Sequence, residues 1–351
     1  MAEKDLRKFT GDETITVSGT MQKINQNGYG ILFLADRCGK LLGSITDGDI
    51  RRYLLSGGKM ESPAIHSANR HPKVATSFEE AKDLYDQRNF VAIPILNDDG
   101  VIIDLYLGES GTPKAKRHNP INCPVVINAG GKGTRLDPFT RVLPKPLIPV
   151  GELPIIEHII KEYKSYNCND FHIIVNYKKS LMKAYFADRK QDYAISWYDE
   201  ERPLGTGGGL SLLRGKIKDT FFFANCDVLL TENYEDMMNF HKKNGNVITM
   251  ICAYKNMSVP YGVVEMGVNG IIQEFREKPQ MSFLTNTGIY IVEPEVIDNI
   301  EDGVPIGFPS IVEKERKKGK RVAAFPVSEN AWMDMGQLPE LEKMRAKLYG
   351  E

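Results

Sequence analysis

Apolar and polar positions are distributed differently in two parts of the chain. After residue 124, apolar runs of about four to seven residues are separated by longer amphipathic stretches and by turn residues. Short apolar runs of this kind are typical of buried strands, and amphipathic stretches of ten or more residues are typical of helices. Strands that alternate with helices predict an α/β fold with a mostly parallel sheet that helices cover on both faces.

The same periodicity places the expected elements. Helices are expected at 153–166, 180–189 and 234–244. Strands are expected at 124–129, 171–177, 194–201, 220–227, 246–254, 262–267, 271–279 and 287–294. Active sites of parallel sheets lie beyond the carboxyl ends of the strands, so residues that follow these strands are the first candidates for chemistry.

The part of the chain before residue 110 repeats one order of elements. A helical stretch, a strand, a glycine turn and a second strand occur around ILFLAD, CGK and LLGSIT, and again around VAIPIL, NDDG and VIIDLYLGE. Each copy has about fifty residues, which is too few to bury its strand face alone. We therefore expect the two copies to pack together as a small α+β domain.

A polar, basic segment with two prolines separates these parts. It reads SGTPKAKRHNPINC, and such a composition is typical of a linker between domains. We expect an N-terminal domain at 1–115, a linker at 116–123 and a larger domain at 124–351.

Composition and charge exclude several classes of protein. Forty-five basic and 46 acidic residues give a formal net charge of -1, so no global field draws the chain to nucleic acid or to an anionic membrane. No run of about 18 apolar residues predicts a membrane span, and the first residues lack the apolar core of a signal peptide. The five cysteines lack metal-ligand spacing, so we expect reduced, mostly buried thiols in a cytoplasmic protein.

The stretch NAGGKGTRL, which follows the first strand of the larger domain, is the candidate phosphate site. A dinucleotide-binding loop requires a third glycine where Leu136 stands and a helix directly afterwards, but four prolines between residues 138 and 149 prevent a regular helix. The sequence also lacks the P-loop pattern. Two readings are left: a tight turn with solvated charges, or a cradle of backbone N–H groups and cations that binds a polyphosphate without a helix dipole.

The segments GGKGTRL, PFT and PKP resemble the signature of the sugar-1-phosphate nucleotidyltransferases, also called NDP-sugar pyrophosphorylases. The resemblance extends from Pro124 to about Gln337 and includes ERPLGTGGG, ANCDVLL, YGVVE, FREKP, NTGIY and WMDMGQ. It implies a Rossmann-like, mostly parallel sheet. It also implies a reaction in which a nucleoside triphosphate and a sugar 1-phosphate form an NDP-sugar and pyrophosphate.

The resemblance further implies roles for individual residues. The catalytic cations would be Arg135 on the β- and γ-phosphates, Lys145 on the reacting phosphoryl oxygens and Lys278 on the sugar phosphate. Asp227 and Asp334 would hold the cofactor Mg²⁺, which prefers oxygen ligands. The remaining matches are Ala129, Gly130, Gly131, Gly133, Thr134, Glu200, Gly205 and Thr206 for the nucleotide, and Gly262, Glu277 and Asn286 for the sugar. Taken singly, each could instead be an ordinary surface charge or turn residue.

The repeated N-terminal region resembles a tandem pair of CBS modules, which often bind adenosine nucleotides and usually pair with a second copy. In TDGD, Thr46 and Asp49 have the spacing with which that family holds a ribose, whereas the second copy reads LGES at the matching place. The resemblance implies an adenosine nucleotide at Thr46 and Asp49, and a homodimer. The alternative is a polar helix N-terminus that Asp49 helps to cap.

Glu200 bears on the choice of base. Uridylyl members of the family carry Gln at this place, five residues before the glycine of L-G-T. An ionised carboxylate only accepts hydrogen bonds, which suits the adjacent N1–H and amine of guanine and matches uracil poorly. We therefore favour GTP over UTP or CTP, the alternative being that Glu200 points to solvent beside Glu201.

The sequence fixes the sugar less well than the base. A CBS pair ahead of a guanylyltransferase resembles the glucosamine-1-phosphate guanylyltransferases of bacterial legionaminic acid synthesis, so glucosamine 1-phosphate is the favoured acceptor, with mannose 1-phosphate as the near alternative. Two further readings stay open: a regulator without catalytic activity, and a cytidylyltransferase that acts on phosphocholine or another non-sugar phosphate.

Overall fold

The computed structural model describes residues 5–87, 90–107 and 119–349, which form two compact units. Unit 1 comprises Met1–Arg117 and Tyr254–Leu284, and unit 2 comprises His118–Ala253 and Thr285–Glu351. The boundary predicted at residue 115, the first three residues of the predicted linker and the last three of LGES lie outside the described residues.

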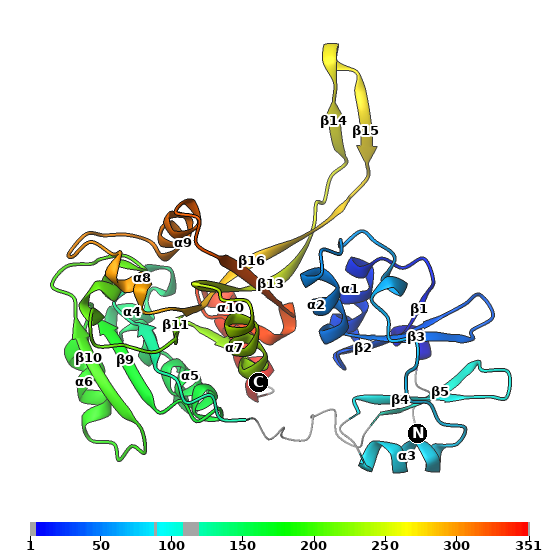
Figure 1. The fold of residues 1–351 in the computed structure, drawn as a ribbon, viewed down its shortest axis with the longest axis horizontal. Helices are drawn as coiled ribbons and strands as arrows, with labels where there is room; N and C mark the ends of the chain where they lie inside the picture. The colour runs from blue at the N-terminus through cyan, green and yellow to red at the C-terminus, as the bar shows by residue number, and fades with distance from the viewer. Residues whose placement is uncertain (1–4, 88–89, 108–118, 350–351) are drawn as a thin grey trace. The chain divides into compact units, whose positions relative to one another are not determined.

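The N-terminal part of unit 1 contains the repeated order that the sequence predicts (Figure 1). The first copy consists of α1 (Val17–Asn27), β2 (Ile31–Ala35), β3 (Leu41–Thr46) and α2 (Asp47–Leu55), with β1 (Thr10–Asp12) parallel to β2. The second copy consists of α3 (Phe78–Gln87), β4 (Ala92–Leu96) and β5 (Ile102–Leu107). Each copy folds its two strands into an antiparallel pair.

The two copies pack against each other, as expected for units that are too short to bury a strand face alone. Phe33 of β2 and Leu105 of β5 belong to one buried cluster. The turns between the strands also meet, because Leu41 N donates to Gly100 O at 3.0 Å and Ile102 N donates to Gly39 O at 3.1 Å. The predicted α+β arrangement of the repeats is therefore confirmed for the described residues.

Unit 1 also contains the hairpin segment, which we define as Tyr254–Leu284. It comprises the antiparallel pair β14 (Val263–Met266) and β15 (Ile272–Arg276), drawn in yellow in Figure 1, and the adjoining ends of β13 (Ile248–Ser258) and β16 (Gln280–Val292). The boundary between the units therefore falls inside β13 and β16, which the apolar pattern of the sequence did not indicate.

Unit 2 is built on a seven-stranded sheet in the order β10-β9-β6-β11-β16-β13-β17. Its other strands are β6 (Val125–Asn128), β9 (Asp170–Val175), β10 (Ala194–Asp199), β11 (Phe221–Asn225) and β17 (Val322–Val327). The pairs β10–β9, β9–β6, β6–β11 and β13–β17 are parallel, whereas β11–β16 is antiparallel. The predicted α/β fold with a mostly parallel sheet is thus confirmed.

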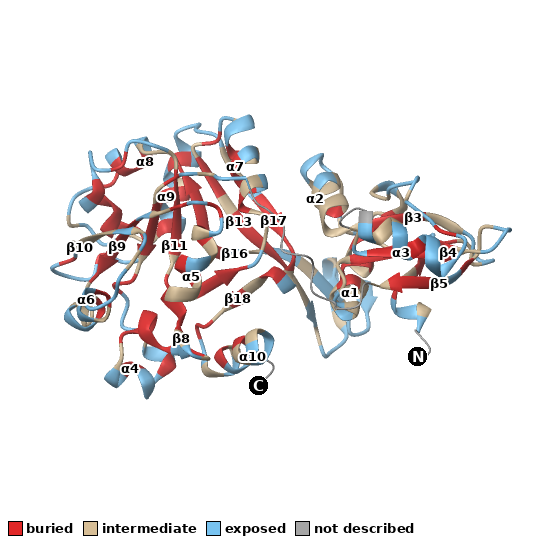
Figure 2. Cartoon of the chain, turned by 90° about the horizontal axis from the view of Figure 1, so that it is seen from below, coloured by how far each residue is buried: buried red, intermediate tan, exposed pale blue. Residues whose placement is uncertain are grey.

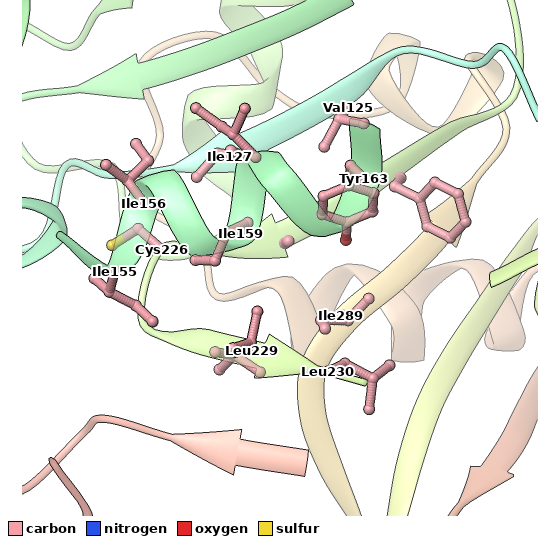
Figure 3. Packing of buried hydrophobic residues seen from close by; sticks show 14 of the residues in the cluster. Val125, Ile127, Ile155, Ile156, Ile159, Tyr163, Cys226, Leu229, Leu230 and Ile289 are labelled. Atoms are coloured by element: carbon pink, nitrogen blue, oxygen red, sulfur yellow. The ribbon is translucent and has the colours of Figure 1, made fainter. Parts of the chain in front are cut away.

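Successive residues of the central strands belong to different cores, because side chains of a strand alternate between its faces. Val125 and Ile127 of β6 lie in one buried cluster and Val126 lies in another. The first cluster includes residues of α5 (Ile155–Lys164), α6 (Lys179–Ala187) and α7 (Tyr234–Lys243), and Figure 3 shows α5 against this face. The second includes α8 (Glu295–Asp298) and α9 (Phe308–Lys317), so helices cover both faces and the central strands are buried (Figure 2).

Further elements complete unit 2, and the sequence pattern missed most of them. They are α4 (Phe139–Val142), α10 (Leu338–Tyr349), and the pairs β7 (Pro149–Val150) with β8 (Leu153–Pro154) and β12 (Val228–Leu230) with β18 (Trp332–Asp334). Of the five cysteines, Cys38 is exposed, the other four are buried, and none forms a disulfide. Within the described ranges, no helix has the length and apolar character needed to span a membrane.

Candidate functional site

The glycine-rich loop leaves the carboxyl end of β6. Gly133 adopts a left-handed backbone with φ 65°, and a Cβ atom there would lie 3.0 Å from Thr140 Cγ2 and 3.1 Å from Lys145 Cβ. Thr140 Oγ1 donates to Gly133 O at 3.1 Å and fixes the loop against the PFT segment. Gly131 is exposed, and a Cβ atom there would meet nothing within 4 Å, so its backbone faces open space.

The loop continues into a single short turn, Thr134–Leu136, and not into a long helix. The prolines that follow have the effect expected from their fixed φ and missing N–H group. Ala129 and Gly130, at the beginning of the glycine-rich loop, are buried, whereas Thr134 and Arg135 are exposed. The loop therefore presents backbone and a cation without a helix dipole behind them.

Lys145 forms an ion pair with Asp227, although the two residues lie far apart in sequence. Lys145 sits in the short helix Lys145–Leu147, and Asp227 lies between β11 and β12. Their side chains are only 11% and 13% exposed. An ammonium and a carboxylate that are this deeply withdrawn from water need each other or another charged partner.

Asp334 lies beside the same pair because β18 runs antiparallel to β12, which places Asp334 opposite Val228. Met335 N also donates to Asp227 O at 2.9 Å. Burial and then the negative charge of Asp227 raise the pKa of Asp334, against the opposing charges of Lys145 and Arg135. The structure therefore brings two carboxylates and two cations together, and we call Arg135, Lys145, Asp227 and Asp334 the charged cluster.

Gly336 is a member of this site that sequence reasoning missed. Its N–H donates to Asp334 Oδ1 at 2.7 Å. A Cβ atom on Gly336 would lie 3.0 Å from Asp334 Oδ1 and 3.4 Å from Arg135 Nη2. The glycine two residues after the aspartate in WMDMGQ was the available signal.

The charged cluster contains ligand atoms of the type that the proposed Mg²⁺ ion needs. Asp227 and Asp334 offer carboxylate oxygens, the ligand type that Mg²⁺ prefers, and the closeness of their charges is what a divalent cation would relieve. Among the described residues, no group of three or more His, Cys, Asp or Glu side chains could hold a metal by itself. A cation here would take its remaining ligands from phosphates and water.

Glu200 is buried, so it does not point to solvent beside Glu201. It is 4% exposed, and its carboxylate lies between the two glycine-rich loops, where a Cβ atom on Gly130 would be 2.8 Å from Oε2 and one on Gly209 would be 2.5 Å from Oε1. Burial raises the pKa of Glu200, opposed by a hydrogen bond from the backbone N–H of Leu204. Oε1 has no hydrogen-bond partner, so the carboxylate has an unused acceptor.

The GTGGG stretch is fixed by its neighbours and is not a flexible turn. Gly207 N and Gly208 N both donate to Ile306 O, at 2.9 and 3.2 Å. Thr206 Oγ1 accepts from Phe308 N at 3.0 Å, and Thr206 O accepts from Asn128 Nδ2 at 3.3 Å. Gly205 has a φ of 77° and, like Thr206, is exposed. The stretch is therefore tied to the end of β6, where the first loop begins.

The residues predicted to bind the sugar are divided between the two units. Asn286 lies in unit 2, where its Nδ2 donates to Tyr290 Oη at 2.6 Å and its Oδ1 accepts from Gly288 N at 3.0 Å. Gly262, Glu277 and Lys278 lie in the hairpin segment of unit 1 and are exposed. A Cβ atom on Gly262 would lie 2.9 Å from Glu277 Oε2, so these two residues are neighbours.

Thr46 and Asp49 form a complete capping box at the start of α2. Asp49 Oδ2 accepts from Thr46 N at 2.9 Å and from Thr46 Oγ1 at 2.6 Å, and Asp49 N donates to Thr46 Oγ1 at 3.3 Å. Asp49 also pairs with Arg52. The capping alternative is therefore present in the structure, and ribose binding stays a prediction.

Comparison with known proteins supports the reading of unit 2. The family model described as "Nucleotidyl transferase" matches residues 124–350. The chain is 34% identical over 226 residues to a "Mannose-1-phosphate guanyltransferase" of Candida albicans, with 60% of each chain covered. A protein of the same name from Saccharomyces cerevisiae is 33% identical over 225 residues, with 60% of this chain and 61% of the relative covered. The chain thus spans about 60% of the length of these relatives.

Solved structures agree on the fold. HddC from Yersinia pseudotuberculosis, in free form and complexed with GMP-PN, has a TM-score of 0.51. It is 21% and 20% identical in the two forms, and the similarity covers 64% of this chain and 99% of that one. At this identity the similarity extends to the fold of the α/β unit alone.

Proposed function

The chain belongs to the nucleotidyl transferase family, and we propose that it transfers a nucleotidyl group from a nucleoside triphosphate to a sugar 1-phosphate. The observation that carries the proposal is the charged cluster beside the glycine-rich loop. Two cations and two carboxylates converge where β6 ends, which is the edge at which parallel sheets place their active sites. Such a site suits a reaction between polyanions.

The proposed reaction needs no activated protein nucleophile. A sugar phosphate has a second pKa near 6, so its oxygen is largely anionic at neutral pH. This oxygen forms a bond to the α-phosphorus, the bond from that phosphorus to the bridging oxygen breaks, and pyrophosphate leaves with the electron pair. Catalysis then consists of positioning and of stabilising the charge that develops.

The protein residues divide this work. The exposed Arg135 holds the β- and γ-phosphates that become pyrophosphate, and Lys145, which is already directed at Asp227, stabilises the reacting phosphoryl oxygens. Asp227 and Asp334 would hold Mg²⁺, which would neutralise phosphate charge when bound. Lys278 holds the phosphate of the sugar. The backbone of Gly130, Gly131 and Gly133 and the neighbouring Ala129 and Thr134 line the triphosphate.

Glu200 supports GTP as the nucleotide. Its buried carboxylate has an oxygen without a partner, and an acceptor of this kind matches the two adjacent donors of guanine. The relatives are also named as guanyltransferases. Gly205 and Thr206, on the loop that packs over Glu200, complete the base site. UTP and CTP are the alternatives that this proposal ranks lower.

For the sugar, two hexose 1-phosphates are proposed. The N-terminal repeats favour glucosamine 1-phosphate, as in legionaminic acid synthesis, through the resemblance of the repeats to a CBS pair. The names of the relatives favour mannose 1-phosphate. Gly262, Glu277 and Asn286 are the residues that would distinguish them, and a carboxylate such as that of Glu277 would favour the amine of glucosamine.

The same proposal includes a regulatory role for the repeats, with an adenosine nucleotide at Thr46 and Asp49 and a homodimer as the assembly.

The rival interpretation, a regulator without catalysis, predicts that phosphate-binding and metal-binding residues are lost. Arg135, Lys145, Asp227, Lys278 and Asp334 are all retained in this chain, which favours an enzyme.

A substrate screen tests the proposal. GTP, UTP, CTP and dTTP are each mixed with glucosamine, mannose and glucose 1-phosphates and with phosphocholine in the presence of Mg²⁺, and pyrophosphate release is measured. We expect release with GTP and with one of the first two sugars. A clear preference for UTP would overturn the assignment of the base, and the absence of release from all pairs, or release with phosphocholine alone, would overturn the sugar nucleotidyl transfer.

A further inference from the structure

We propose that helix α1 positions Lys278, so that the N-terminal repeats set the affinity of the enzyme for its sugar 1-phosphate. The inference rests on the proposed function, in which Lys278 holds the phosphate of the sugar. It adds Ser18 and Gln22 as positioning residues, although they lie about 260 residues before Lys278 in the sequence. All of these residues belong to unit 1.

Two polar contacts join α1 to the start of β16. Ser18 Oγ and Ser282 Oγ share a hydrogen bond, and Gln22 Nε2 donates to Gln280 Oε1. Ser18 and Gln22 are four residues apart and share one face of the helix, and Gln280 and Ser282 are two residues apart and share one face of the strand. One face of α1 therefore matches one face of β16 at both points.

The other strand of the hairpin segment is held by the same helix. Ser282 Oγ donates to Asn256 Oδ1 at 2.6 Å, which ties the end of β13 to the start of β16. Tyr254 is 5% exposed and lies in one buried cluster with Val17 and Met21 of α1. The helix thus contacts the hairpin segment through an apolar core and through polar contacts at its edge.

Lys278 needs such support because of its backbone conformation. It follows β15 in a left-handed conformation with φ 45°, which is uncommon for a residue other than glycine. A conformation of this kind is strained and persists only where its surroundings impose it. The next residue, Pro279, is held by a hydrogen bond that its carbonyl accepts from Val259 N at 3.0 Å. Gln280 follows Pro279 and makes the contact with Gln22 of α1.

The chain between Lys278 and its anchors is short. Only Pro279 separates Lys278 from Gln280, and the ring of proline fixes φ at its own position. Little rotational freedom is therefore left between the contact with Gln22 and the ammonium-bearing residue. A change at Ser18 or Gln22 is expected to widen the range of positions that Lys278 visits.

The test uses the full chain with the double substitution Ser18→Ala/Gln22→Ala. We expect the KM for the sugar 1-phosphate to rise by about fivefold to tenfold, because two hydrogen bonds of ordinary strength are lost. The KM for GTP and kcat should each stay within about twofold of the values of the unmodified chain. The substitution is expected to weaken the binding of the sugar 1-phosphate equally in the ground state and in the transition state. Gln26→Ala is the matched control, since Gln26 is exposed on α1.

A double-mutant cycle checks that the contact itself acts. Ser282→Ala removes both the hydrogen bond shared with Ser18 and the one to Asn256, so it should raise the KM for the sugar 1-phosphate at least as much as Ser18→Ala does. Adding Ser18→Ala to Ser282→Ala should then raise the KM no further, because the partner of Ser18 is already absent. Ser18→Thr, which keeps the hydroxyl, should restore most of the affinity. The thermal midpoint of each variant is recorded beside its kinetics.

The outcomes separate the two proposals. Pyrophosphate release by the unmodified chain, with an unchanged sugar KM in the double variant, would overturn the positioning role and leave the proposed function intact. A lower kcat together with a higher KM for both substrates and a lower thermal midpoint would also overturn the positioning role, because that pattern indicates a structural role only. If the unmodified chain neither releases pyrophosphate nor binds the sugar 1-phosphates in calorimetry, both proposals fail.

Discussion

The Thr46–Asp49 pair and the charged cluster are both small groups of polar residues that follow strands, yet their local chemistry differs. In the first, the hydroxyl, the carboxylate and the backbone N–H groups satisfy one another in a capping box. In the second, the Lys145–Asp227 ion pair and Asp334 lie together at partly buried positions, and burial, followed by the negative charge of Asp227, raises the pKa of Asp334. Folding alone explains the first group, whereas the second holds like charges together at a cost that folding does not require.

The largest expected effect comes from removing the cation of the cluster. Lys145→Ala should lower kcat by at least about a hundredfold, because a charge aimed at the reacting phosphoryl group is lost. The protein should still fold. Pyrophosphate release and circular dichroism measure the two effects.

Lys164→Ala provides the matched control for this prediction. It removes another Lys–Asp ion pair of unit 2, with Asp192, whose lysine sits at the end of α5 and outside the charged cluster. Its turnover should match that of the unmodified chain. Near-normal turnover of the Lys145 variant would mean that the cluster, like the capping box, is structural.

Removing one carboxylate sharpens the same comparison. Asp227→Asn keeps the size of the side chain but loses its charge, so kcat should fall by about a hundredfold and the Mg²⁺ concentration for half-maximal activity should rise. Asp236→Asn, on the exposed side of α7, is the control. An unchanged Mg²⁺ requirement would remove Asp227 from the metal site.

A smaller effect is expected at Glu200. Glu200→Gln should raise the KM for GTP by about tenfold and leave turnover with saturating GTP nearly unchanged, since an acceptor for guanine is exchanged for a mixed donor and acceptor. Glu201→Gln, on the exposed neighbour, should have no such effect. Equal losses for GTP and UTP would show that Glu200 supports the loops without reading the base.

The pH dependence follows from the burial of Glu200, which raises its pKa. The charged form is the acceptor, so GTP binding is complete above the folded pKa and weakens as the pH falls through it. Because that pKa is raised, the KM for GTP should begin to rise at a higher pH than for an ordinary glutamate. In Glu200→Gln the KM for GTP should not rise as the pH falls. A rise that persists in this variant would show that another group titrates.

The smallest effect is expected at the capping box. Thr46→Ala should lower the unfolding free energy by about 1 kcal/mol, as for other helix caps. Thr16→Ala is matched to it, because Thr16 caps α1 by accepting from Gly19 N. Calorimetry with AMP, ADP and ATP then separates the two readings of Thr46. Nucleotide binding that is lost in Thr46→Ala and kept in Thr16→Ala supports a ligand site, and unchanged binding in both leaves a cap only.

The sequence predicted the sheet of unit 2 well because its strands are short apolar runs between turn residues. The expected strand at 171–177 is observed as β9, and the helix expected at 153–166 is α5, which begins after Pro154. Prolines also predicted correctly that no long helix follows the glycine-rich loop. These features depend on local periodicity and on fixed φ angles, which a sequence displays directly.

Features that depend on distant pairing were not accessible in the same way. Asp227 and Asp334 meet only because β12 and β18 pair across more than a hundred residues, and they could be named beforehand only through a family resemblance. The sequence favoured Glu200 as an acceptor for the base and left open the alternative that it points to solvent beside Glu201, whereas the structure buries Glu200 against Gly130 and Gly209. Hydrophobic periodicity also could not tell that Tyr254 packs with α1.

The division of β13 and β16 between the units affects how the protein can be shortened. A fragment that begins at residue 119 keeps every residue of the charged cluster but still carries Tyr254, which is buried in a cluster with residues of the N-terminal repeats, including Val17 and Met21 of α1. Such a fragment would expose an aromatic side chain on a strand end and invite association between fragments. Deleting the whole hairpin segment, Tyr254–Leu284, together with the repeats would avoid this exposure, at the expense of Lys278. A simple N-terminal truncation therefore cannot remove the repeats without exposing a residue of the remaining chain that packs against them.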